Sequence, residues 1–467
     1  MLINRSFLCS SVKRYQSVLA VLVFLISFVS CMNRPKSASD SQQAGLEKVL
    51  YIPEKVYGIP DSNDYENPES DFCFQHMVQS ENVAIFWHKE YGDDPMANQD
   101  TTRRFDAQFA LKECERFYDY YVNELKMVEK GHSVTDTFKL LVYVIGGDGG
   151  TAFGGGEEDK IGILWTPAVR INKAPYGALA HEMGHCFQYL SRAESGKGPR
   201  GAIMEMSAQY MLWHVYPEWM TFENYHLKDF MKGTHYAFLH PQNMYHSPYV
   251  LEYWSEKHGK EFFGELCRNT EKGEDPVMTY KRLNELTQEQ FNDEIFDASR
   301  RFITWDLQRV KKVAHQYANQ HFTKLVDDGD GWFRIDSANC PQNYGYNGIK
   351  LNVPEAGTKV ELVFEGMAGT SGYSSVKPEL AGWRYGFLAS LENGKRVYGD
   401  MGQTASGKLT FKVPKHTEYL WLVVSGAPTE HWPLPMRWGR QKDETPDAQW
   451  PYKIKLNGTD PDKGMIL

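Results

Sequence analysis

The sequence lacks the features that mark several large protein classes. It has 7 cysteines in 467 residues, widely scattered and without a CxxC pair, which argues against a disulfide framework and against a thiolate zinc site. Its formal net charge is -9, so the basic surface that nucleic-acid binding requires is not expected. Internal repeats and low-complexity tracts are also absent. The composition favours ordinary folded domains in which most cysteines are small buried apolar residues.

A hydrophobic run long enough to span a membrane is missing as well. The apolar run from Val18 to Val29 has about 12 residues, whereas a transmembrane helix needs about 20. Basic residues precede this run and Cys31 follows it, which is the order of a secretory signal peptide. The ending Phe-Val-Ser-Cys is similar to a bacterial lipobox. The sequence therefore predicts a lipoprotein signal peptide over residues 1–31, lipidation of Cys31, and an exported protein anchored at the cell envelope or surface. Ordinary secretion and a signal anchor are the alternatives.

The remaining chain divides into three segments. Residues 32–70 are polar and without periodicity, which predicts a flexible tether. Residues 71–325 combine strand and helix patterns, and they are mainly helical from 176 to 307. Residues 326–467 contain short β-prone runs separated by Gly, Pro and Asn. The expected fold is an α+β domain followed by an all-β sandwich domain.

Hydrophobic patterns place the individual elements. In the first domain, strands are expected at 82–88, 138–145 and 161–166, and an amphipathic helix at 102–127. The glycine-rich TAFGGGEED segment before Ile161 is expected to be flexible. In the second domain the expected strands are Lys359–Glu365, Trp383–Leu391, Lys408–Val413, Tyr419–Ser425 and Tyr452–Leu456.

The segment His181-Glu182-Met183-Gly184-His185 carries the chemistry. Helix positions i and i+4 share a face, so His181 and His185 can direct their imidazoles at one Zn²⁺. Glu182 lies beside them, where it can act as general base toward a water activated by the metal. The flanking residues are apolar or uncharged, so the helix should be buried, and a buried His–Glu–His group is unfavourable unless paired or metal-bound. The alternative is a helix whose histidines are satisfied core residues.

The third zinc ligand is expected to be Glu205. It is the one carboxylate of an almost uncharged helical stretch, residues 201–213, where an unpaired carboxylate would be unfavourable. Glu194 is the alternative, but it lies among polar residues that are expected to form a solvated turn. A metzincin site is excluded, because Gln188 and Ser191 stand where that class has glycine and histidine.

The motif HEMGHCFQ, with a glutamate about twenty positions later, is similar to the HExGH-type gluzincin metallopeptidases, which include the enhancin and mucin-peptidase families. The chain resembles more closely an uncharacterised family of secreted bacterial zincin-like proteins with a C-terminal β domain. That likeness runs through ENVAIFWHKEYGDDP, IGILWTP, VVSGAP and WPYKIKL, and so spans nearly the whole mature chain. Met204 departs from the thermolysin-like signature, which has asparagine before the ligand.

The resemblance implies a zincin-like metallohydrolase domain with His181, His185 and Glu205 as Zn²⁺ ligands and Glu182 as base. Zincins also use a Tyr, His or Arg to stabilise the oxyanion. They commonly pair an extended substrate with an edge strand beside the motif helix, and Ile161–Thr166 is the expected strand. The oxyanion candidates lie between residues 210 and 250: Tyr210, His214, His235, Tyr236, His246 and Tyr249.

The leading hypothesis is an exported zinc metallopeptidase that acts on proteins or glycoproteins. It is expected to be a monomer without a nucleic-acid partner, and to contact the membrane only through its lipid anchor. The alternative is a surface glycan- or protein-binding lipoprotein on a zincin scaffold with little or no catalysis. Four tryptophans of the second domain could then stack on sugars, unless they fill its core: Trp383, Trp421, Trp432 and Trp438. Hydrolysis of a non-peptide amide or ester is a third hypothesis.

Overall fold

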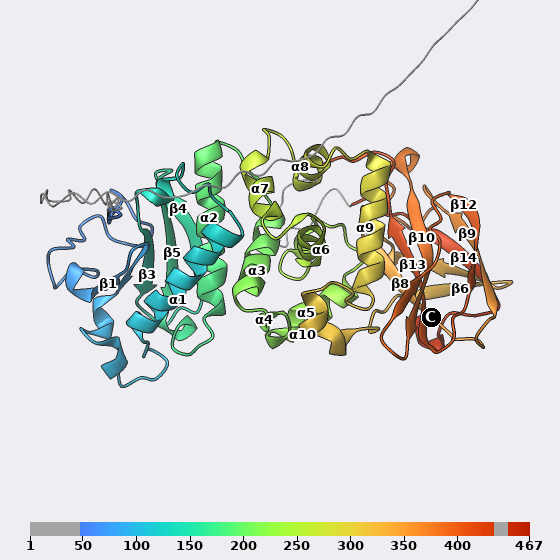
Figure 1. Cartoon of the computed structure of the whole chain (residues 1–467), viewed down its shortest axis with the longest axis horizontal. Coiled ribbons are helices and arrows are strands. Elements are labelled where there is room, and N and C mark those ends of the chain that lie inside the picture. The colour runs from blue at the N-terminus through green and yellow to red at the C-terminus, as the bar shows by residue number, and fades with distance from the viewer. Residues whose placement is uncertain (1–46, 434–446) are drawn as a thin grey trace, which may run out of the picture. The chain divides into compact units, whose positions relative to one another are not determined.

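A five-stranded mixed sheet forms the first part of the fold (Figure 1). The computed structural model describes residues 47–433 and 447–467. The strand order is β1-β2-β3-β5-β4, in which β2, β3 and β5 are parallel and β4 is antiparallel to β5. Both β2 and β5 are buried along their whole length, as strands are when both faces of a sheet are covered. The strands are β1 (Met77–Gln79), β2 (Val83–Trp87), β3 (Leu140–Ile145), β4 (Phe153–Glu157) and β5 (Ile161–Pro167).

Two helices cover one face of this sheet. Helix α1 (Ala107–Asp119) packs on β2, and helix α2 (Gly177–Ser195) packs on β4 and β5. The side chain of Asp106 caps α1, and Gly196 ends α2 in the left-handed conformation at φ 69°. The helix expected over 102–127 is therefore present in its central part, and it continues into a π-helical turn.

The opposite face of the sheet is covered by the chain that precedes it. Val56 and Phe72 are buried against the aromatic and aliphatic side chains of β2, β3 and β5. Residues 47–70, which the sequence analysis assigned to the tether, therefore pack on the sheet. Their apolar side chains, which include the short run 49–52, do not follow a sustained period, so no periodicity revealed them. The predicted signal peptide, Cys31 and the first part of the tether lie outside the described residues, and so does Trp438.

The middle of the chain is helical, as expected. Helix α3 (Ile203–Val215) packs on α2. Gly184 lies in this contact, where a Cβ would meet the Cα of Ala208 at the ordinary van der Waals distance of 3.4 Å. In the described parts of the chain, no helix is long and apolar enough to cross a membrane. The helices that follow are α4 (Trp219–Phe222), α5 (Asn224–Lys232), α6 (Tyr249–His258), α7 (Phe262–Asn269), α8 (Pro276–Leu283), α9 (Gln288–Phe302) and α10 (Val310–Ala314).

Two antiparallel sheets form the C-terminal part. Their strand orders are β11-β10-β13-β8 and β12-β9-β14-β7-β6, and residues from both sheets share one hydrophobic core. Helix α9 packs on β10 and β13 (Figure 1), and Glu47–Leu467 forms one compact unit of α+β class. The strands are β6 (Leu325–Gly329), β7 (Trp332–Ile335), β8 (Tyr346–Leu351), β9 (Lys359–Gly366), β10 (Trp383–Leu391), β11 (Arg396–Tyr398), β12 (Ser406–Lys412), β13 (Thr417–Gly426) and β14 (Tyr452–Asn457).

The edge strand of the first sheet differs from the prediction. The expected strand Ile161–Thr166 is β5, which is internal because it pairs with β3 on one side and with β4 on the other. The edge beside α2 is β4, whose sequence FGGGE lacks β-branched residues and was expected to be flexible.

Strands β1, β6, β7, β8 and β11 were also not predicted. All strands predicted in the second domain are present, and the cysteines of the described residues are buried and free: Cys73, Cys114, Cys186, Cys267 and Cys340.

Candidate metal centre

The three expected ligands meet between α2 and α3. The Oε2 atom of Glu205 lies 3.1 Å from Nε2 of His181 and 3.3 Å from Nε2 of His185. The centroids of the two imidazole rings are 4.9 Å apart. One donor atom from each residue lies within 4.8 Å of the other two. The structure therefore brings together two imidazoles and a carboxylate that could hold a metal ion.

The local fold explains this meeting. The four-residue spacing places His181 and His185 on one face of α2. The chain reverses after Gly196, and α3 then packs on α2 across Gly184. Glu205 stands in the first turn of α3 and so faces the histidines. The glycine of the motif therefore lies in the helix–helix contact that positions the carboxylate, with ordinary van der Waals space around it.

Gln188 orients His185 from one turn further along α2. Its amide nitrogen donates to the carbonyl of Met204 and to the hydroxyl of Ser207, both at 2.8 Å. Its amide oxygen is thus left for Nδ1 of His185, at 2.9 Å, and this nitrogen must be the protonated one. The other ring nitrogen, Nε2, keeps its lone pair toward the metal group, the name used here for His181, His185 and Glu205 together, as a histidine ligand requires. In the sequence, Gln188 argued against a metzincin site, but its role in positioning His185 was not predicted.

The carboxylate of Glu205 and the imidazole of His185 shift each other's pKa values. Burial opposes ionisation of Glu205, but its hydrogen bonds to His181 and His185, together with their charge, outweigh burial and hold its pKa well below the ordinary value. Burial likewise acts to lower the pKa of His185, but the hydrogen bond and charge of Glu205 outweigh it and raise that pKa. An ionised carboxylate beside two imidazoles is a donor set that fits a divalent cation, which would take the place of the shared proton.

Glu182 lies next to this group and in contact with the edge strand. Its side chain is buried, and burial raises its pKa, an effect that the nearby His181 and His185 oppose. Strand β4 approaches so closely that a Cβ on Gly154 would lie 2.1 Å from the backbone oxygen of Glu182. The motif helix and the edge strand can therefore touch only because position 154 is glycine.

A cavity of about 680 Å³ opens beside His181 and Glu182. Large exposed apolar side chains are collected at its rim: Val169, Phe222, Tyr225 and Tyr245. Exposed apolar side chains that gather in one place mark binding surfaces more often than scattered ones do. The metal group thus lies at a hollow whose walls suit an apolar ligand group.

The expected oxyanion residues lie elsewhere. In the described part of the chain, none of the six candidates lines this cavity. Tyr210 donates to the carbonyl of Lys260, and His214 is hydrogen-bonded to the hydroxyl of Tyr120, so both serve the helical core. His246 contacts a residue that does line the cavity, because its Nδ1 lies 2.8 Å from Nδ1 of His226. Aromatic and histidine residues are so frequent in this region that the sequence could not rank them.

Tyr245 is the residue that sequence reasoning missed. Its ring is stacked toward His181, with centroids 6.4 Å apart, and it lines the cavity. Burial and the nearby carboxylates of Glu205 and Glu182 raise the pKa of Tyr245 to about 12. Its hydroxyl therefore stays protonated at neutral pH and remains a hydrogen-bond donor beside the metal group.

Glu194, the alternative ligand, is not in a loop. It lies within α2, and its carboxylate accepts hydrogen bonds from the hydroxyl of Ser133 and from the backbone N–H of Val134. Burial raises the pKa of Glu194. Its place on the far turn of the helix gives it a structural role, which its polar neighbours in the sequence concealed.

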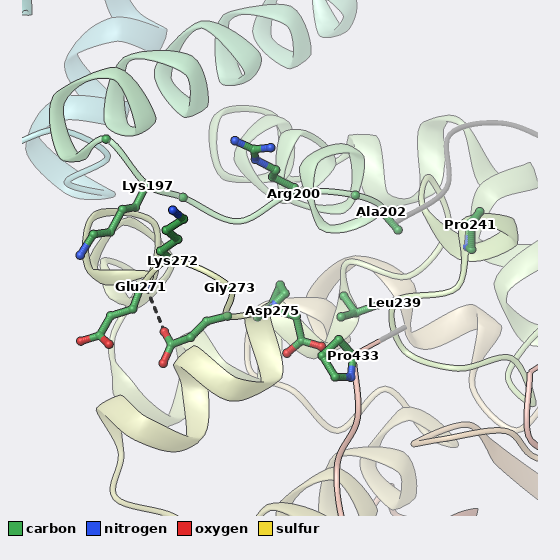
Figure 2. Close-up of a pocket in the computed structure, with 15 residues that line it drawn as sticks. Lys197, Arg200, Ala202, Leu239, Pro241, Glu271, Lys272, Gly273, Asp275 and Pro433 are labelled. Atoms are coloured by element: carbon green, nitrogen blue, oxygen red, sulfur yellow. Dashed lines mark hydrogen bonds between the residues drawn. The ribbon is translucent and has the colours of Figure 1, made fainter. Parts of the chain in front are cut away.

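A larger cavity, of about 820 Å³, is lined by the segment 196–202 and by the loop before α8 (Figure 2). Three basic side chains line it: Lys197, Arg200 and Lys272. Glu274, which lies there too, is already engaged by Arg282 at 2.7 Å. Residues of the metal group do not line this cavity, so its size alone does not identify a functional site.

Comparisons with known proteins place the chain in a family. The crystal structure of the Yersinia pseudotuberculosis-derived mitogen is 9% identical, covers 25% of this chain and 76% of its own, and has a TM-score of 0.16. The Glycosylation Associate Protein (Gap123) complex from Streptococcus agalactiae is 10% identical, covers 29% and 38%, and has the same TM-score of 0.16. No curated protein matches the chain. The profile of the family of unknown function DUF6055 matches residues 42–463, and the chain belongs to this family.

Proposed function

We propose that the protein is an exported zinc-dependent metallopeptidase of gluzincin type that hydrolyses peptide bonds of proteins or glycoproteins. The observation that carries the proposal is the group of His181, His185 and Glu205 held beside Glu182 at the 680 Å³ cavity. Buried imidazoles and carboxylates are unfavourable unless they are paired or bind a metal. The likeness of the motif to HExGH-type gluzincins supports the same function.

The donor set fits zinc. Catalytic zinc sites use three protein ligands of nitrogen, oxygen or sulfur type and leave a further position open. His181, His185 and Glu205 would be these ligands, with His185 held by Gln188. When bound, zinc would polarise the substrate carbonyl and lower the pKa of a water molecule.

Two side chains would move or hold protons in the reaction. Glu182 would accept the proton of the attacking water and deliver it to the leaving amine. Its raised pKa suits this double role, because a carboxyl that is a stronger base than usual is also protonated more readily. The hydroxyl of Tyr245 would donate a hydrogen bond to the oxyanion that develops on the former carbonyl oxygen.

Strand β4 would bind the substrate main chain. It is an edge strand that packs on α2 directly beside Glu182. The backbone groups along its free side can pair with an extended peptide by β-augmentation. The substrate would thus pair with β4 and not with β5, the strand expected from the sequence.

The glycan-binding alternative has less support. Trp383 and Trp421 are 2% and 0% exposed, so two of the four candidate tryptophans fill the core. Trp432 is half-buried, with the ammonium of Lys377 over its ring at 4.7 Å.

We further propose a zincin-like domain followed by a β-sandwich, export through residues 1–31 and lipidation of Cys31.

Metal analysis and a peptide screen test the proposed function. Purified protein should contain about one zinc per chain. Glu205→Gln should lose this zinc and Glu194→Gln, the matched control, should keep it. Glu182→Gln should retain zinc and lose cleavage of a proteome- and mucin-derived peptide library. Identical product profiles for the wild type and Glu182→Gln would reject the peptidase, and full zinc content in Glu205→Gln would reject the third ligand.

A further inference from the structure

Strand β4 has a second face, opposite to the metal centre. Side chains alternate between the two faces of a strand. A Cβ on Gly154 would meet the backbone of Glu182, and a Cβ on Gly156 would lie 2.2 Å from the ring of Tyr189, so both positions face α2. The other positions of β4 face away from α2: Phe153, Gly155 and Glu157.

A cavity of about 470 Å³ lies on this second face. Gly155 lines the cavity and leaves space in it, because nothing lies within 4 Å of a Cβ built on this residue. The rings of Phe153 and Trp165 are stacked, with centroids 4.8 Å apart, and Tyr57 meets both rings edge-on at 5.5 and 6.2 Å. Tyr57 is 70% exposed, so its ring is accessible to a ligand.

Glu157 adds a negative charge to these aromatic walls. It is half-buried and lines the cavity. In residues 47–433 and 447–467 its carboxylate has neither a hydrogen-bond nor an ion-pair partner. The neighbouring Glu158, in contrast, is bound by Tyr51 and Lys160. A carboxylate without a partner beside aromatic rings favours a cation, which gains both an ion pair and a cation–π contact.

We propose that this cavity binds a lysine or arginine side chain of the peptide that pairs with β4. This inference rests on the proposed function, because a paired peptide would direct alternate side chains to the two faces of the sheet. Gly154 lies beside Glu182, and the cavity lies on the other face of β4 along the positions from Phe153 to Glu157. At about 3.3 Å per residue, the basic residue would lie within about three positions of the cleaved bond. The net charge of -9 also favours the approach of basic substrates.

Paired peptides that differ in one side chain test this site. The best library substrate is made with lysine or with norleucine at each position near the cleaved bond. At one position, kcat/KM should be higher for lysine, and the lysine-to-norleucine ratio should fall about fivefold in Glu157→Gln and in Tyr57→Ala. Glu54→Gln is the matched control, because it removes an exposed carboxylate near Tyr57 that does not line the cavity, and its ratio should equal that of the wild type.

The outcomes separate this site from the proposed function. If the wild type cleaves peptides without a basic preference, or if Glu157→Gln keeps that preference, the inference is overturned and the peptidase stands. If no cleavage depends on Glu182, the peptidase is rejected. Fluorescence anisotropy of labelled lysine and norleucine peptides then tests binding to the cavity directly. Equal binding of the lysine peptide to the wild type and to Glu157→Gln would overturn the proposed lysine site. A preference for glycosylated peptides that Tyr57→Ala removes and Glu157→Gln does not would show that a sugar is the occupant.

Discussion

Leucine in place of Gln188 should weaken zinc binding without touching a ligand. The wild-type side chain accepts from Nδ1 of His185 and donates to Met204 and Ser207. After the substitution, the Met204 carbonyl still accepts from the Ser207 hydroxyl at 3.1 Å, so the main loss is the partner of the His185 Nδ1–H group. A buried donor without a partner costs about 1–3 kcal/mol of unfolding free energy. Removal of a group that orients a ligand weakens metal binding by about 10- to 100-fold.

Two measurements check these magnitudes. Competition with a chromogenic chelator gives the zinc affinity, and urea unfolding of the metal-free protein gives the stability. Ser207→Ala is the matched control, because it leaves the hydrogen bonds from Gln188 to His185 and to the Met204 carbonyl in place, and its zinc affinity should stay within about threefold of the wild type. Wild-type affinity in Gln188→Leu, or an equal loss in both variants, would refute the positioning role of this hydrogen bond.

Three further predictions concern groups around the metal centre. Tyr245→Phe should lower kcat by about 100-fold with a smaller change in KM; steady-state kinetics with an unchanged kcat would remove this hydroxyl from the mechanism. Gly154→Ala should lower the free energy of unfolding by more than about 1 kcal/mol, because its Cβ would collide with the backbone of Glu182. Gly155→Ala is the control at an open position, and its free energy of unfolding should stay within about 0.5 kcal/mol of the wild type. Equal effects of the two variants in urea unfolding would contradict this packing. In the metal-free protein, Glu182→Gln should raise stability near neutral pH, because burial raises the folded-state pKa of Glu182 above its unfolded value and makes the ionised form unfavourable. This gain should vanish below the ordinary value of 4.5, where the carboxyl is protonated in both states, so a gain that persists in acid would contradict the assignment.

The candidate metal centre could be predicted from the sequence because most of it is local. His181 and His185 share one helix face through their spacing alone. Glu205 could be proposed because a single carboxylate in an uncharged helical stretch needs a partner, and the structure brings it to both histidines. The same reasoning misplaced Glu194, because a polar run of residues can end a helix as readily as it can form a turn.

The sequence by itself determined the motif helix, the residues that could bind a metal ion, and most strands with an apolar pattern. Only the tertiary structure decided that glycine-rich β4 is the edge beside Glu182, that Tyr245 borders the metal group, and that Tyr57 meets Phe153 on the far face of the sheet. The physical reason is the origin of each signal. Helical spacing and hydrophobic alternation act over a few residues, whereas these contacts join segments distant in sequence and depend on how closely main chains pack. Between β4 and Glu182, glycine is what makes the close packing possible, and in a sequence it indicates only the absence of a side chain.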